Sequence, residues 1–83
     1  MSLNEKLTRK LNKQFEPSAL INMRFAEKDI AFRTDENGHP VLLFIGEKKE
    51  PGLIKGERYT RILRFDEDGK KIKDHWELKG RSG

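Results

Sequence analysis

Two dipeptides, Asn37-Gly38 and Asp68-Gly69, constrain the fold of this chain more than any other feature of its sequence. Each lies between segments in which apolar and polar residues alternate. Asn-Gly and Asp-Gly are preferred in two-residue hairpin turns of type I′, because both central residues of such a turn need a positive φ angle. The sequence therefore predicts antiparallel strands joined by tight hairpins.

The start of the chain is predicted to form a helix over about residues 3–14. Apolar side chains recur there every four residues, which is typical of one stripe of a helix: Leu3, Leu7, Leu11 and Phe15. Ser2 and Glu5 have the spacing of a capping box, and Pro17 disfavours helical geometry at the residue before it. The other faces are basic and polar, and the apolar stripe is narrow, so we expect this helix to pack on its own domain rather than on a membrane surface.

After Pro17 the period of the apolar residues changes from four to two, which indicates strands. Five strands are predicted, at about residues 19–26, 29–35, 40–46, 57–66 and 70–79. The segment from Val41 to Ile45 is an unbroken apolar run, which is typical of a strand buried on both faces. The predicted fold class is α+β: one N-terminal helix followed by a five-stranded antiparallel meander, within a single domain over residues 1–83.

The hairpin registers place most apolar side chains on one face. The Asn37-Gly38 turn pairs Phe32 with Leu43, and a loop at Glu27-Lys28 pairs Phe25 with Ile30. A slip of one residue would scatter this set over both faces, so the pattern specifies the register strongly. The predicted inner face holds Ile21, Met23, Phe25, Ile30, Phe32, Val41, Leu43, Ile45, Tyr59, Leu63, Phe65, Ile72, Trp76 and Leu78. This set is too large for a flat sheet under one helix, so we expect a strongly curled sheet or a partly closed small barrel.

The opposite face is predicted to be mixed. Its four apolar residues need a cover, which the helix or a second copy of the chain can supply: Leu20, Leu42, Phe44 and Ile62. The long connection over residues 46–56 is a further candidate contact, because it carries Leu53 and Ile54 between glycines and loops often carry function. The alternative is that Leu53 and Ile54 close one end of the barrel.

Two charged residues, Arg61 and Asp74, are predicted to lie on the inner face beside Tyr59 and Trp76. Unpaired buried charges each cost several kcal/mol, so the two should meet. A two-residue Asp68-Gly69 turn sets Arg61 opposite Trp76 for a cation–π contact, and a four-residue turn sets it opposite Asp74 for a salt bridge. We favour the salt bridge, because Asp74 has no other inward partner. The alternative interpretation is a ligand pocket lined by these four residues.

Most catalytic and metal-binding chemistries find no support in the sequence. The chain has no cysteine and two histidines, too few for a zinc site of the usual kind. Asp74 and His75 are neighbours on a strand and point to opposite faces, so they do not form a catalytic pair. We therefore expect no enzyme activity, no cofactor and no metal. No apolar run approaches the roughly 18 residues of a membrane span and no secretion leader stands out, so we expect a cytoplasmic protein.

Charge leaves two classes of partner open. Charged residues make up 39% of the chain, the net charge is +4, and both ends are basic. The first expectation is a non-enzymatic binding or assembly module that forms a homodimer through the outward apolar residues. The alternative is a small nucleic-acid-binding barrel that uses the basic ends and four outward arginines around Phe44: Arg24, Arg33, Arg58 and Arg64.

Overall fold

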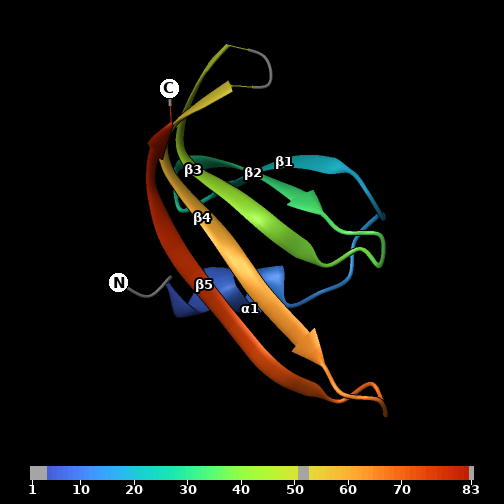
Figure 1. Cartoon of the computed structure of the whole chain (residues 1–83). Coiled ribbons are helices and arrows are strands. Elements are labelled where there is room, and N and C mark those ends of the chain that lie inside the picture. Colours follow the sequence, from blue (N-terminus) through green and yellow to red (C-terminus); the bar gives the residue numbers. More distant parts are fainter. Residues whose placement is uncertain (1–3, 51–52, 83) are drawn as a thin grey trace.

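The computed structural model describes residues 4–50 and 53–82, without the side chains of residues 48–50, 53 and 82. One short helix precedes a five-stranded antiparallel sheet, and the chain is mostly strand (Figure 1). The elements are α1 (Glu5–Leu11), β1 (Leu20–Phe25), β2 (Lys28–Thr34), β3 (Pro40–Glu50), β4 (Leu53–Phe65) and β5 (Lys71–Ser82). The strands follow one another in the order β1-β2-β3-β4-β5, and hydrogen bonds do not close the sheet between β1 and β5.

Helix α1 begins at a different cap from the predicted one. The N-cap is Asn4, whose side-chain oxygen accepts hydrogen bonds from the backbone N–H of Lys6 at 2.8 Å and of Leu7 at 3.4 Å. These bonds satisfy N–H groups that have no partner within the helix. The predicted cap Ser2 and the first stripe residue Leu3 lie outside the described residues.

The helix also ends earlier than predicted, at Leu11 rather than near residue 14. Beyond it the chain is bound to the sheet instead of to itself, because the N–H of Phe15 donates to the carbonyl of Gly38 at 2.8 Å. The side chain of Gln14 donates to the carbonyl of Asn37 at 2.9 Å in the same turn. These tertiary hydrogen bonds replace the last predicted turn of the helix. The local sequence does not predict them.

Both Asx-Gly turns are four-residue turns rather than type I′ turns. For the turn at residues 66–69 this is the second of the two predicted alternatives. The N–H of Gly38 donates to the carbonyl of Asp35 at 3.1 Å, and the N–H of Gly69 donates to the carbonyl of Asp66 at 3.0 Å. Within each turn only the glycine has a positive φ angle, 85° and 80°. The aspartate that opens each turn accepts two further backbone N–H groups with its carboxylate, which explains the longer form.

The positive φ angles expected of a type I′ turn occur instead at Ala26 and Glu27, with values of 49° and 66°. Phe25 therefore pairs with Lys28, and the predicted pairing of Phe25 with Ile30 is wrong by two residues. A shift of two residues leaves every side chain on its face, so the inner face of β1 and β2 is unchanged. The pairing of β2 with β3 is as predicted at its centre, where Phe32 stands opposite Leu43.

We expect the β1–β2 turn to be a place where stability can be gained. The double substitution Ala26→Asn with Glu27→Gly should raise the free energy of unfolding by about 1 kcal/mol, because a left-handed conformation costs residues with a β-carbon roughly that much. Urea denaturation followed by circular dichroism measures the change. Glu36→Gly is the matched control, since Glu36 lies in a turn at a negative φ angle and should bring no gain. A lower denaturation midpoint for the double variant would contradict this account of the turn.

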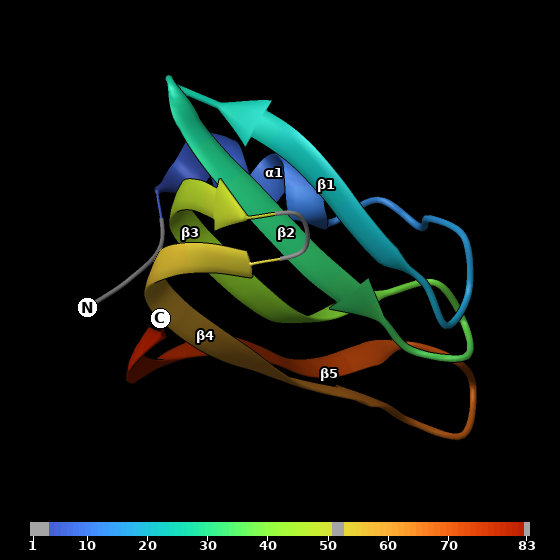
Figure 2. The same cartoon turned by 90° about the horizontal axis from the view of Figure 1, so that it is seen from above.

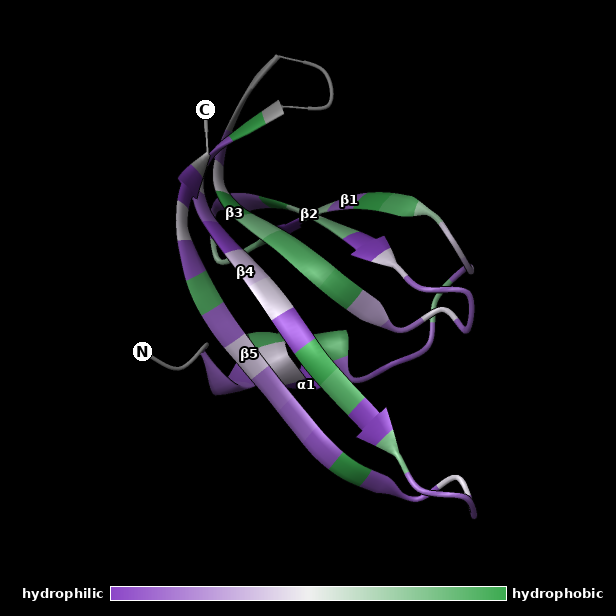
Figure 3. Cartoon of the chain, in the orientation of Figure 1, coloured by the Kyte–Doolittle hydropathy of each residue, from purple (hydrophilic) through white to green (hydrophobic). Residues whose placement is uncertain are grey.

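The hydrophobic core lies between α1 and the side of the sheet that faces it, the inner face. Its buried members are Leu7, Leu11, Ile30, Phe32, Leu43, Tyr59 and Trp76. Phe15 packs against Phe32 edge to face, with ring centroids 4.9 Å apart. Hydrophobic residues are most frequent along β1 and β3, whereas β5 is mainly hydrophilic (Figure 3). The helix therefore covers the inner face and leaves the opposite side of the sheet free of it.

Three residues that were predicted to lie in this core are exposed. The exposed fractions of Phe65, Ile72 and Leu78 are 44%, 64% and 40%. All three lie on β5 or at the end of the β4–β5 hairpin. This hairpin extends beyond the rest of the molecule, and β5 is an edge strand (Figure 1). Alternation assigns a side chain to a face correctly, but burial also requires an element opposite that face.

The predicted loop over residues 46–56 is part of a long hairpin, because β3 continues to Glu50 and β4 begins at Leu53. Gly46 stands opposite Gly56 in this hairpin. A Cβ atom on either glycine would overlap the backbone of the other strand, so the two strands approach closely there. Beyond this pair the hairpin turns, and its end lies over β2 on the side away from α1 (Figure 2).

Ile54, the second residue of β4, lies near the end of this hairpin and is buried. It is 4% exposed, and it lines a small cavity together with Asn22, Arg24 and Asp29 of β1 and β2. The chain therefore uses Ile54 to cover its own sheet, and this residue is not available as the exposed contact that was predicted. The side chain of Leu53 lies outside the described residues.

Candidate binding surface on the sheet

The side chain of Arg61 is almost fully buried and is hydrogen-bonded within the protein. Its Nε and Nη2 atoms donate to the two carboxylate oxygens of Asp74, both at 2.7 Å. Its Nη1 atom donates to the carbonyls of Leu11 at 3.4 Å and Pro40 at 3.2 Å, and Nη2 also donates to Oδ1 of Asn12 at 3.2 Å. These bonds occupy all five N–H groups of a guanidinium. Arg61 thus joins the end of α1 to the sheet and has no donor left for a ligand.

The register of the last hairpin sets Arg61 opposite Trp76, so the predicted position opposite Asp74 is wrong. The guanidinium carbon lies 5.4 Å from the centroid of the Trp76 ring, and the salt bridge to Asp74 forms diagonally. A register shift between Arg64 and Phe65 offsets the longer turn. The two contacts that the sequence presented as alternatives therefore occur together.

The carboxylate of Asp74 is strongly stabilised in its charged form. Its hydrogen bond from Arg61 is the main cause, with help from Lys71 at 3.0 Å, and together they outweigh partial burial and lower its pKa to about 2. The side chain of Asp74 is 21% exposed, so solvent screens this interaction in part.

This lowered pKa predicts a loss of stability in acid. Asp74 contributes stability fully above its unfolded pKa of about 3.9, and the contribution disappears as the pH falls through the folded value near 2. We expect Asp74→Asn to lower the free energy of unfolding by about 1–2 kcal/mol near neutral pH, and the difference from the parent protein to vanish towards pH 2. Denaturant titrations at a series of pH values measure this difference. A constant difference across the series would contradict the role of the charge.

The predicted alternative pocket around Arg61 is filled by the protein itself. Tyr59 and Trp76 belong to the buried core and are 2% and 8% exposed. Burial of the Tyr59 hydroxyl raises its pKa, and so do the charge of Glu57 and a hydrogen bond with that carboxylate. Neither the small cavity beside Ile54 nor the larger one beside Gly46 and Gly56 is lined by any of the four residues of that predicted pocket.

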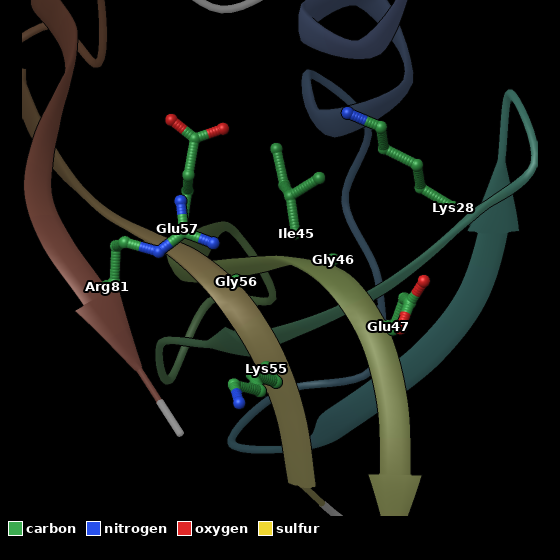
Figure 4. A pocket seen from close by; sticks show the side chains of 8 residues that line it. All are labelled: Lys28, Ile45, Gly46, Glu47, Lys55, Gly56, Glu57 and Arg81. Carbon is green, nitrogen blue, oxygen red and sulfur yellow. The ribbon is translucent and has the colours of Figure 1, made fainter.

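A larger open cavity, of about 420 Å³, lies on the inner side of the sheet where the β3–β4 hairpin turns (Figure 4). Its lining comes from β2, β3, β4 and β5: Lys28, Ile45, Gly46, Glu47, Lys55, Gly56, Glu57 and Arg81. Glu57 stands opposite Arg81, and Glu47 stands opposite Lys55. Cations and carboxylates nearly balance in this cavity, so it favours neither sign of ligand charge. The two glycines of this hairpin, Gly46 and Gly56, are its one signal in the sequence.

The outer face, the side of the sheet turned away from α1, carries the four apolar residues predicted for it. Leu20 is 43% exposed, and Leu42, Phe44 and Ile62 are half-buried. Leu20 and Leu42 flank Arg33 in one row across the strands, and Phe44 stands between Ala31 and Arg58 in the next row. These apolar groups are thus interleaved with cations rather than gathered in a continuous patch.

Four exposed cations lie on this outer face: Arg33, Arg58, Arg64 and Lys73. Among the side chains that the structure describes (residues 4–47 and 54–81), no carboxylate forms an ion pair with any of them. Arg64 stands opposite Lys73, so two of these charges are neighbours. We call these four residues the basic outer face.

The other charges on this side are already neutralised. Arg24, the remaining arginine of the predicted set, lies 3.3 Å from the carboxylate of Asp29. Glu77 lies 2.9 Å from the ammonium group of Lys79, whose hydrogen bond lowers its pKa. Lys73 and His75 were not among the predicted contacts, although their alternation along β5 places both on the outer face. The outer face is therefore a basic surface with Phe44 among its cations.

Other kinds of site find no basis in the part of the chain that the structure describes. No group of three or more His, Asp or Glu side chains there is arranged to hold a metal ion. None of the helices described is long and apolar enough to cross a membrane. Comparisons with protein-family models, with curated proteins and with solved structures give no match.

Proposed function

We propose that this chain is a non-enzymatic binding module that contacts its partner through the outer face of the sheet. The observation that carries this proposal is the position of α1, which packs on the inner face and leaves Leu20, Leu42, Phe44 and Ile62 without the helix over them. Half-buried apolar groups beside unpaired cations are a surface suited to contact. The polar interior offers no comparable site, because Arg61 is fully hydrogen-bonded within the protein.

The shape of the sheet supports this use. Strands β1 and β2 run in a different direction from β4 and β5 in both views (Figures 1 and 2). We propose that the sheet is strongly curled, as in a partly closed small barrel, with α1 across the open side. A curled sheet on one packed core holds the backbone of its outer face in a fixed shape, which lowers the entropy lost on binding.

Charge distinguishes two kinds of partner for this face. In a two-fold homodimer, the same patch is used twice, so the four cations of the basic outer face would lie near their own copies. Like charges brought together in an interface cost several kcal/mol. Self-association through this face is therefore the weaker candidate, and a partner with negative charge is the stronger one. This reverses the order in which the sequence alone placed them.

Two measurements test whether the outer face binds at all. Sedimentation velocity over a range of protein concentrations detects self-association. Fluorescence anisotropy with labelled anionic polymers, namely a single-stranded oligonucleotide, a duplex and polyglutamate, detects an acidic partner. We expect a monomer that binds at least one polymer, and Arg58→Glu with Arg64→Glu should weaken that binding. A protein that stays monomeric and binds none of the polymers would overturn the proposal.

A further inference from the structure

We infer that the outer face binds single-stranded nucleic acid, with phosphates on the basic outer face and a base against the ring of Phe44. This inference rests on the proposed function and names the partner. Proteins that bind single strands without a fixed sequence combine cations that follow the backbone with an aromatic ring on which a base stacks. Both parts occur here on adjacent strands, since Phe44 of β3 stands directly opposite Arg58 of β4.

The cations are spread widely enough to follow a strand rather than to hold one phosphate. On the outer side of β4, Arg58 lies near the middle of the strand and Arg64 near its end, roughly 20 Å apart at about 3.3 Å per residue. Lys73 lies beside Arg64 on β5, and Arg33 lies across the sheet on β2. A single phosphate group or a small anion could reach only one or two of these groups, whereas a chain of phosphates can reach all four.

The apolar residues among these cations favour a single strand over other anionic polymers. Phe44 and Leu42 follow each other on the outer side of β3, and Ile62 lies on β4. Unpaired bases have apolar faces that can lie on such groups. A duplex keeps its bases stacked inside and offers mainly phosphates to a sheet face, and an acidic peptide has no planar face for the ring. The ring of Phe44 and the aliphatic groups would therefore add little to the affinity for a duplex or for an acidic peptide.

Salt dependence gives the first quantitative test. The probes are a labelled mixed-sequence single strand, as RNA and as DNA, and a duplex of the same sequence, measured by anisotropy. Four phosphate contacts on a single strand should give a slope of log K against log salt of about −3. We expect the single strand to bind more tightly than the duplex. Equal or tighter binding of the duplex would overturn the inference.

Two matched pairs of substitutions locate the site. Arg58→Glu with Arg64→Glu reverses two cations of the basic outer face, and Lys10→Glu with Lys13→Glu reverses two exposed cations at the helical end of the chain. Both change the net charge by the same amount. We expect the first pair to weaken single-strand binding about ten-fold or more and to halve the salt slope, and the second pair to have a much smaller effect. Equal losses from the two pairs would mean non-specific attraction and would overturn the inference.

The aromatic contact is tested by Phe44→Leu, which keeps an apolar side chain against Ala31 and removes the ring. We expect about ten-fold weaker binding with an unchanged salt slope, because stacking carries no counterion release. A thermal melt shows that the variant is folded, and Leu42→Ala on the same strand supplies a second apolar variant that keeps the ring. Wild-type affinity of a folded Phe44→Leu would overturn the stacking contact.

Failure of this inference can be told apart from failure of the proposed function. Binding of polyglutamate, but of neither oligonucleotide, would retain the outer face as a binding surface and reject nucleic acid. Concentration-dependent dimers that Phe44→Glu converts to monomers would likewise retain the face and reject the partner. Only a protein that stays monomeric and binds none of the polymers overturns both the inference and the proposed function.

Discussion

Arg61→Met is expected to lower the free energy of unfolding by about 3 kcal/mol or more, because it breaks a largely buried ion pair and removes every hydrogen bond of the guanidinium. The side chain of Arg61 is 1% exposed, and its loss deprives Asp74 of two hydrogen bonds at 2.7 Å. The carbonyls of Leu11 and Pro40 also lose their donor. The link between the end of α1 and the sheet should be lost together with the salt bridge.

Arg64→Met is the matched control for this prediction. It makes the same chemical change on the same strand, but Arg64 is exposed on the outer face. Surface substitutions of this kind change stability by about 0.5 kcal/mol or less. Chemical denaturation of both variants measures the contrast, and a double-mutant cycle with Asp74→Asn gives the coupling energy. Equal stabilities of the two methionine variants would show that Arg61 does not join helix and sheet.

Phe32→Ala should lower the free energy of unfolding by about 3–5 kcal/mol, because it removes a buried ring and leaves a cavity. Phe32 is fully buried, stands opposite Leu43 and meets the ring of Phe15. A domain of this size has a stability towards the lower end of about 5–15 kcal/mol, so the variant should be largely or wholly unfolded at moderate temperature.

The control for this core substitution is Phe65→Ala, the same change at a ring that is 44% exposed. We expect it to cost less than half as much as Phe32→Ala, since less surface is returned to water. Thermal melting followed by circular dichroism compares the two variants. A greater loss from Phe65→Ala would place the core at the end of the β4–β5 hairpin and not around Phe32.

The basic outer face shows how far sequence reasoning reached towards the candidate site. Alternation placed Arg33, Arg58 and Arg64 on one side of the sheet with Phe44, and the structure has them there. It did not indicate that Arg24 is neutralised by Asp29, nor that Ile54 is buried beneath the β3–β4 hairpin. Those outcomes depend on where a neighbouring strand or hairpin ends. The alternation of apolar and polar residues does not predict that position.

The side of the sheet covered by α1 was the decisive point left open. Leu7 and Leu11 could have packed over either face, because both faces have apolar residues. They belong to the same buried cluster as Phe32 and Leu43, where the apolar groups are continuous, and the outer face is left without the helix. An amphipathic stripe indicates that a helix packs on an apolar surface, but it does not indicate which surface.

What the sequence by itself determined is local: five strands, the face of the strand residues away from the register shifts, and the pairing at the centre of β2 and β3. A period of two and a strong apolar contrast suffice for these, and even the wrong β1–β2 register preserved the faces because it differed by two residues. The tertiary structure alone decided the cap and end of α1, the turn of the hairpin at Gly46 and Gly56, and the diagonal bond between Arg61 and Asp74. Each of these depends on atoms that are distant along the chain or on the exact course of the backbone, and a pattern of residue types carries neither.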